Sequence, residues 1–150
     1  MSILEASLAI KDQILNDRHN LHRCPEIGFN LPQTAAYVQK RLTEMGIESQ
    51  LCGGPIDKQL RDNFVFAGFP DMEASTGVVA TIGKGEPCIL LRADMDALPM
   101  TETPGLVDFT SEVPGMAHMC GHDTHTAMLL GAAKLLKDRE DELKGTVKLM

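Results

Sequence analysis

The stretch Cys88-Ile-Leu-Leu-Arg-Ala93, together with Gly145-Thr-Val-Lys-Leu-Met150 further along the chain, decides the fold class. Both runs are short and mostly apolar, and the first shows no polar alternation, which is typical of a strand buried on both faces. Between them a helical pattern begins after Asp123 and runs to about Lys137. Because a strand, a crossover helix and a second strand form a parallel pair with a right-handed connection, the sequence predicts an α/β fold.

Further elements are expected before this unit. Ser2-Ile-Leu-Glu5 has the spacing of a capping box, and the apolar period after it predicts a helix that ends at Pro25. A second helix is expected from Pro32 to just before Gly46. The run Gly77-Val-Val-Ala-Thr-Ile82 predicts a strand that pairs with Cys88–Ala93.

Three segments are harder to assign. Residues 47–51 are short enough for a strand, whereas residues 52–75 are punctuated by glycine and proline and are interpreted as a loop or insertion. Asp94 to His122 shows almost no helical or strand pattern, an unusual length for a connection inside a compact domain. Such long loops commonly carry function, so this one is a candidate for the site.

Composition and charge exclude several classes of function. The 150 residues carry 14 basic and 21 acidic side chains, a net charge of −7, which argues against a nucleic-acid partner. No apolar run is long enough to span a bilayer, and the start carries Glu5 and no cationic leader, so we expect a cytoplasmic protein without a membrane partner. Four cysteines without a CxxC pair are therefore interpreted as thiols, with Cys88 as a small core residue.

Two clusters of chemically active side chains flank the long loop. Asp94-Met-Asp96 follows a buried strand, at the end of the sheet where α/β proteins bind ligands, and His118-Met-Cys-Gly-His-Asp-Thr-His125 leads into a helix. Thiolate, imidazole and carboxylate are ligands of divalent transition metals, so Cys120, His122 and one or both aspartates could converge on one ion. Taken alone, such an aspartate pair is more often a pair of solvated loop carboxylates than a site.

Neighbouring residues support the same interpretation. Cys120 would sit before a helix N-terminus, where the helix dipole favours the thiolate. Asp123 is expected to cap that helix and to accept a hydrogen bond that orients His122, and His125 would lie on the same helix face. Outside the cluster, His22 is interpreted as a structural polar residue at a helix end, and Glu102 as solvated.

Five motifs follow one another in the order of a known family. They are Leu21-His-Arg-Cys-Pro-Glu26, Leu91-Arg-Ala-Asp-Met-Asp-Ala-Leu-Pro99, Gly115-Met-Ala-His-Met-Cys-Gly-His-Asp-Thr-His125, Ala127-Met-Leu-Leu-Gly-Ala-Ala-Lys134 and Leu143-Lys-Gly-Thr-Val-Lys148. Together they closely resemble the M20 metallopeptidase family, in particular the amidohydrolases that include hippurate hydrolase, N-acyl-amino-acid hydrolases and auxin-conjugate hydrolases.

The resemblance implies a fold, a reaction and roles for individual residues. It implies a zinc-peptidase-like three-layer α/β catalytic domain, and hydrolysis of the amide bond of N-acyl amino acids or peptides with one or two ions of Zn, Mn, Ni or Co. Cys120 and His122 look like metal ligands, and Asp96 like the aspartate that orients a ligand. Asp94 stands where related branches place a metal-binding histidine. His118, Asp123 and His125 would support the ligands.

The resemblance also implies that residues 1–150 are a truncated, N-terminal portion of that catalytic domain. The general-base glutamate and a metal-binding glutamate would follow the strand that begins at Gly145, and the lid and dimerisation domain, which would allow a homodimer, would lie later still. We therefore expect the isolated chain to be inactive. The alternatives are a non-catalytic metal-binding or interaction module, half of a split enzyme, and a degraded gene product that folds poorly.

Overall fold

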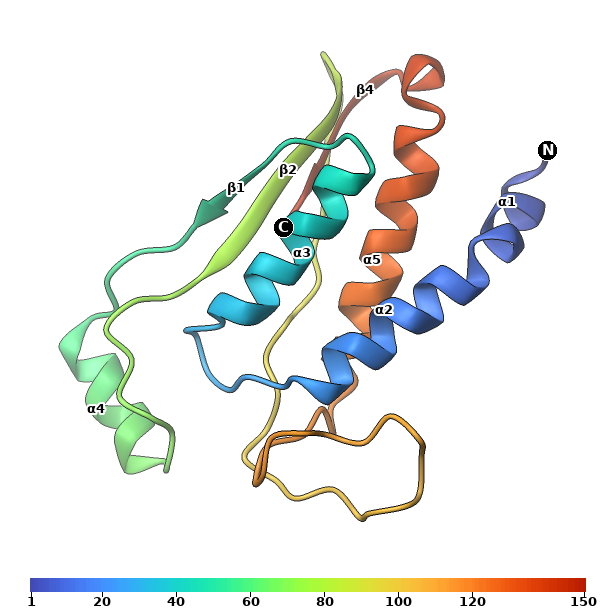
Figure 1. The fold of residues 1–150 in the computed structure, drawn as a ribbon. Coiled ribbons are helices and arrows are strands. Elements are labelled where there is room, and N and C mark those ends of the chain that lie inside the picture. Colours follow the sequence, from blue (N-terminus) through green and yellow to red (C-terminus); the bar gives the residue numbers. More distant parts are fainter.

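The computed structural model describes residues 1–150. Its elements are the helices α1 (Ile3–Ala9), α2 (Lys11–Arg23), α3 (Pro32–Glu44), α4 (Lys58–Phe66) and α5 (His122–Lys137), a 3₁₀ turn at Glu140–Glu142, and the strands β1 (Ser49–Cys52), β2 (Gly77–Lys84), β3 (Cys88–Leu91) and β4 (Gly145–Leu149). The strands form one mixed sheet, as Figure 1 shows.

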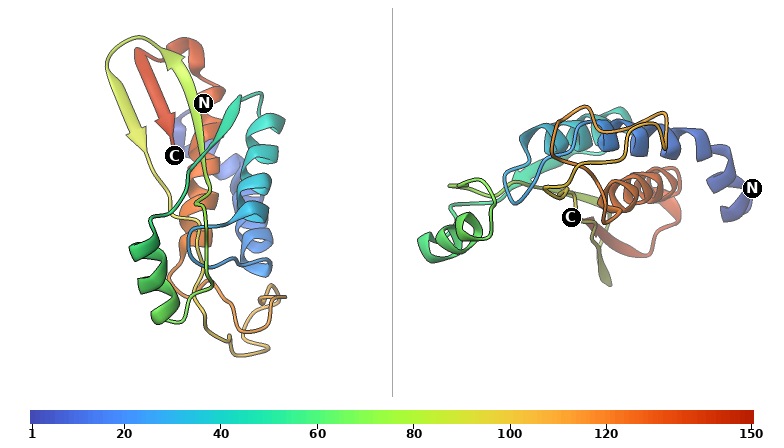
Figure 2. Two further views of the ribbon diagram at one scale, coloured as in Figure 1. Left: turned by 90° about the vertical axis from the view of Figure 1, so that its left-hand side faces the viewer. Right: turned by 90° about the horizontal axis from the view of Figure 1, so that it is seen from below.

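The sheet has the order β1-β2-β4-β3. β3 and β4 are parallel and are joined through α5, whereas β2 is antiparallel to both of its neighbours. The helices α2, α3 and α5 lie on one side of the sheet (Figure 2). The predicted α/β class is confirmed: residues 1–150 form a mixed sheet with helices on one side of it.

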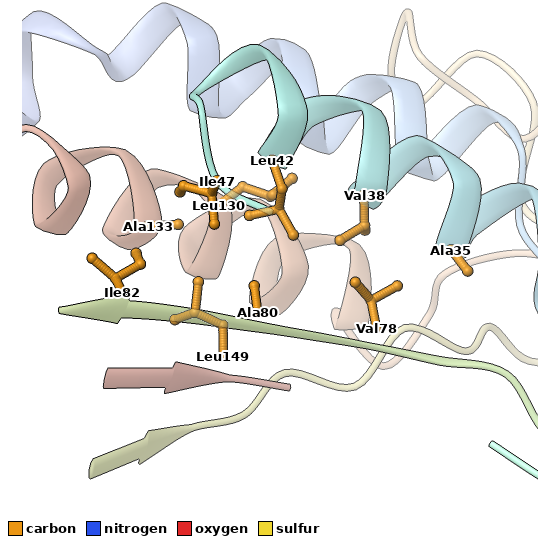
Figure 3. Close-up of a cluster of buried hydrophobic side chains, with 10 residues drawn as sticks. All are labelled: Ala35, Val38, Leu42, Ile47, Val78, Ala80, Ile82, Leu130, Ala133 and Leu149. Carbon is orange, nitrogen blue, oxygen red and sulfur yellow. The ribbon is translucent and has the colours of Figure 1, made fainter. Parts of the chain in front are cut away.

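The hydrophobic core lies between the sheet and the two helices α3 and α5 (Figure 3). Alternate residues of β2 point toward the helices because side chains along a strand alternate between its faces. The buried side chains are those of Ala35, Val38, Leu42, Ile47, Val78, Ala80, Ile82, Leu130, Ala133 and Leu149. α5 packs against the helices α2 and α3 and against β2. These contacts fix the axis of α5, and therefore the place of its first turn.

The pairing of the middle strands differs from the prediction. Gly77–Ile82 and Cys88–Ala93 are not partners, because β4 lies between them and pairs with both. β3 is instead an edge strand in which Ile89 is 55% and Leu90 53% exposed, and Cys88 is exposed rather than part of the core. A continuous apolar run cannot distinguish a central strand from an edge strand whose faces are open.

The helices differ in detail from their predicted bounds. The capping box of Ser2 and Glu5 is present, but the first helix breaks at Ile10, whose backbone φ of −103° and ψ of 9° separates α1 from α2. The segment 52–75, interpreted as a loop or insertion, contains α4, capped by the Asp57 carboxylate. The second helix and α5 have the expected extents, although α5 begins at His122.

The close packing of α5 against α2 gives a first prediction. A Cβ atom added at Gly131 would lie 2.7 Å from Cδ1 and 2.9 Å from Cγ1 of Ile14. We expect Gly131→Ala to lower the free energy of unfolding by about 1–3 kcal/mol, although alanine is the better helix former, because overpacking outweighs propensity. Urea denaturation measures the change. In an Ile14→Ala background the same substitution should cost almost nothing, and an equal cost there would contradict this explanation.

Candidate metal centre

The predicted site residues gather at one end of the molecule, where β3 ends and α5 begins. Asp94 follows β3 by three residues, and its carbonyl oxygen accepts a hydrogen bond of 2.9 Å from the hydroxyl of Thr126 on α5. Arg92 forms an ion pair with the Asp94 carboxylate. The strand end and the first turns of α5 are therefore tied directly to each other.

Gly121 makes the sharp entry into α5 possible. Its φ of 91° and ψ of 16° are left-handed, a conformation that costs little for glycine and much for other residues. The helix begins with His122, so Asp123 lies in the first turn and is not the predicted cap. The predicted role of glycine between Cys120 and His122 is consistent with this bend.

His122 is oriented by Asp96. Its Nδ1 atom lies 2.9 Å from Oδ1 of Asp96 and 2.9 Å from the backbone carbonyl oxygen of the same residue. Because both partners can only accept, Nδ1 carries the hydrogen, and the lone pair is on Nε2. This is the arrangement in which a second group fixes the tautomer of a metal-ligating histidine. Asp96, rather than Asp123, orients His122 in this way.

Three potential ligand atoms converge beside this pair. One ligand-type atom each of Asp94, His122 and His125 lies within 4.8 Å of the other two. The imidazole rings of His122 and His125 are 5.5 Å apart, as expected for residues three apart on a helix. A carboxylate and two imidazoles suit a divalent ion such as Zn²⁺ or Mn²⁺, so the donor chemistry fits the expected cofactor.

Cys120 does not belong to this group of three. Cys120 is exposed in the turn before α5 and is not among the three converging residues. The ligand roles predicted for Cys120 and for His122 both stay predictions. His125, expected only to support the ligands, is instead placed among the potential ligands. The spacing of His122 and His125 was the signal for it, because side chains three residues apart on a helix share one face.

Asp123 is buried and pairs with α2. Its Oδ2 atom accepts a hydrogen bond of 3.2 Å from Nε of Arg18 and lies 2.8 Å from Nδ1 of His22. Burial would raise the pKa of Asp123, but hydrogen bonds from His22 and from the amide of Thr124 hold it below its ordinary value. Asp123 is therefore a carboxylate that joins two helices.

His118 and Glu102 are both removed from solvent. The ring of His118 is buried, neither of its nitrogens has a hydrogen-bond partner, and its centre lies 6.1 Å from that of His22. Glu102 was interpreted as solvated, but its side chain is 12% exposed. The amide of Ser111 and the ring of His22 donate to it and lower its pKa.

The buried ring of His118 leads to a prediction of pH dependence. Burial lowers its pKa from 6.5 to about 4, so between these values the unfolded chain binds a proton that the folded chain does not. This contribution to stability is complete above pH 6.5 and is lost as the pH falls toward 4, by up to about 3 kcal/mol. In metal-free buffer, urea denaturation should show a shallower acid loss for His118→Gln than for wild type. His19→Gln is the matched control, and equal slopes for wild type and His118→Gln would contradict the expectation.

Fold and site together define a class: an α/β domain in which histidine and aspartate side chains that could bind a divalent ion gather where a parallel strand ends and a helix begins. Comparison with known proteins points to one family. The family model described as "Peptidase family M20/M25/M40" matches residues 90–150. This match, with the relatives described next, confirms the predicted resemblance to the M20 peptidase and amidohydrolase family.

Three relatives show how much of the family the chain covers. An IAA-amino acid hydrolase ILR1-like 5 of Arabidopsis thaliana is 39% identical over 93% of this chain and 27% of its own length. An N-acetyl-L-cysteine deacetylase of Bacillus subtilis is 41% identical over 94% of this chain and 29% of its own. The crystal structure of the Bacillus subtilis YXEP protein, described as a dinuclear metal binding peptidase from the M20 family, has a TM-score of 0.73 and 38% identity, covering 94% of this chain and 35% of that one. The chain thus spans about a third of these relatives.

None of the five α-helices is both long and apolar enough to cross a membrane.

Proposed function

We propose that residues 1–150 form the metal-binding part of a metal-dependent amidohydrolase that cleaves the amide bond of N-acyl amino acids. The observation that carries the proposal is the convergence of Asp94, His122 and His125, with His122 oriented by Asp96. The names of two relatives support the substrate class, because one is a hydrolase of an amino acid conjugate and the other a deacetylase of an N-acetyl amino acid.

The residues of the chain would hold and orient the ion. An ion of Zn, Mn, Ni or Co held by His122, with Asp94, His125 or Cys120, would supply Lewis-acid activation of water and of the scissile carbonyl. Asp96 keeps the ligand nitrogen of His122 aimed, and Thr126 holds the backbone at Asp94. That the site binds one or two ions, and that these are Zn, Mn, Ni or Co, is part of this proposal.

A pocket beside the two aspartates provides space for a substrate. Its lining includes Asp94, Asp96, Phe29, Ser75 and Thr76. The lining combines carboxylates, hydroxyls and an aromatic ring, as is usual for a site that orients a small polar molecule. An amide of an acylated amino acid placed there would lie next to the potential ligands.

We further propose that the 150-residue chain does not turn over substrate by itself. The family resemblance assigns the general base to a glutamate that follows the strand at Gly145, and a general base contributes about 10²–10⁴-fold to such reactions. The test is to incubate N-acetyl amino acids and Zn²⁺ or Mn²⁺ with this chain, and with a longer form that continues through paired glutamates. We expect hydrolysis only by the longer form. Robust hydrolysis by the 150 residues alone, or none by the longer form, would overturn the proposal.

A second candidate is a non-catalytic metal-binding module, or half of a split enzyme. It is favoured by one observation: all three converging ligand atoms come from residues 94–125, so the set is contained in this chain. Calorimetric titration with Zn²⁺ separates the two functions. Tight binding with no hydrolysis by either form supports the module, whereas weak binding that strengthens in the longer form supports the enzyme. A cytoplasmic location and a homodimer remain predictions.

A further inference from the structure

Both ring nitrogens of His22, near the end of α2, face carboxylates. Nδ1 lies 2.8 Å from Oδ2 of Asp123, and Nε2 lies 3.0 Å from Oε1 of Glu102. His22 is only 4% exposed and Asp123 1%. Hydrogen bonds to a charged carboxylate are strong where water is excluded. The contacts of His22 with Asp123 and Glu102 therefore form a rigid connection rather than a surface contact.

The three residues belong to three different parts of the chain. His22 is on α2, Asp123 is in the first turn of α5, and Glu102 is in the long segment between β3 and α5. Within that segment the backbones of Leu98 and Ala117 pair through two hydrogen bonds of 3.0 and 3.1 Å, which close residues 98–117 into a loop. We call these residues the 98–117 loop; Figure 1 shows it below the end of α2.

The 98–117 loop is docked on α2 at several points. The ring of Phe109 stacks on that of His19 at 4.0 Å, and the Arg18 guanidinium lies 5.1 Å from the centre of the same ring. The amide of Glu112 donates to the carbonyl of Arg23 over 2.8 Å. Immediately after the loop come His118, Cys120 and His122, so the position of the loop determines where the potential ligands begin.

Glu102 connects the two sides of the loop as well. While Oε1 faces His22, Oε2 accepts a hydrogen bond of 2.8 Å from the amide of Ser111. A carboxylate accepts only, and imidazole is the side chain that offers two nitrogens in opposite directions. Few other side chains at position 22 could join Asp123 and Glu102 simultaneously.

We propose that His22 is a positioning residue, which through Asp123 and Glu102 holds the first turn of α5 and the 98–117 loop in one fixed arrangement. The consequence for His122 and His125 rests on the proposed metal site, whereas the consequence for the loop does not. His22 itself is not among the converging potential ligands.

Hydrogen exchange of the metal-free chain tests the loop. In His22→Ala we expect backbone amides of residues 98–117 to exchange at least about 10-fold faster than in wild type, because two charge-assisted hydrogen bonds are lost, while amides of β2 and β4 keep their rates. His19→Ala is the matched control, since it removes a ring that touches Phe109 but no carboxylate contact. Wild-type exchange in the loop of His22→Ala would overturn the proposal.

A second readout separates positioning from simple loss of stability. We expect His22→Ala to alter the visible absorption spectrum of the Co²⁺-loaded chain and to weaken Co²⁺ binding by about 10–100-fold, as changes behind a ligand do. Should His22→Ala unfold as a whole, Glu102→Ala removes the contacts of Glu102 with His22 and Ser111 but leaves that of His22 with Asp123, so it should speed exchange in the loop alone; unchanged loop exchange there would contradict the proposal. If neither the 150-residue chain nor the longer form binds Co²⁺, the proposed function fails while the exchange result still decides the role of His22.

Discussion

His122→Ala is expected to bind Zn²⁺ at least about 100-fold more weakly than wild type, the largest loss of any single substitution at the site. His122 is the potential ligand whose free nitrogen is fixed, because Asp96 holds its other nitrogen at 2.9 Å. Calorimetric titration at millimolar metal concentration measures the change even if the wild-type site is weak.

Asp96→Asn provides the graded comparison for His122→Ala. The amide can still contact the ring, but it carries no charge, so an intermediate loss of about 10-fold is expected. His19→Ala, a histidine outside the group of converging atoms, should bind Zn²⁺ as wild type does. Equal affinities of wild type and His122→Ala would show that the ion binds elsewhere.

Asp17→Ala is expected to lower the free energy of unfolding by about 2–3 kcal/mol, because the half-buried Arg41 guanidinium and the Tyr37 hydroxyl lose a buried acceptor, although Arg41 keeps its pair with Glu44. Asp17 is 1% exposed, and its Oδ1 accepts from Nε of Arg41 and from the hydroxyl of Tyr37, both over 2.7 Å. These bonds connect α2 to α3. Urea denaturation followed by circular dichroism measures the loss.

An exposed ion pair in α4 is the control for Asp17→Ala. Nζ of Lys58 lies 2.7 Å from Oδ2 of Asp62, a distance equal to that of the buried pair, but both side chains are exposed. Asp62→Ala should therefore change stability by less than about 1 kcal/mol. Similar losses in Asp17→Ala and Asp62→Ala would mean that burial is not what makes the first pair important.

Local patterns predicted much of the fold. The parallel unit of β3, α5 and β4 follows from two apolar runs separated by a helical period, and the capping box at Ser2 is as expected. The place of β4 between β2 and β3 could not be predicted, because two neighbouring strands with a short connection usually form a hairpin. Sheet order depends on contacts between residues more than 60 positions apart in the sequence, and no local pattern contains this information.

The candidate site was predicted in its parts but not in its assembly. Asp94, Asp96 and His122 lie together as their positions at a strand end and a helix start suggest. The roles of His22 and Glu102 were missed because residues 80 positions apart meet only when the long loop folds back on α2. Irregular segments have no period, so burial within them cannot be derived from sequence.

The most direct test of the metal centre is anomalous diffraction at the zinc absorption edge from crystals soaked in Zn²⁺. We expect one main peak about 2.0–2.2 Å from a ring nitrogen of His122, with Asp94, His125 or Cys120 completing the contacts. A soaked crystal with no peak beside His122, or with its main peak elsewhere on the chain, would contradict the account.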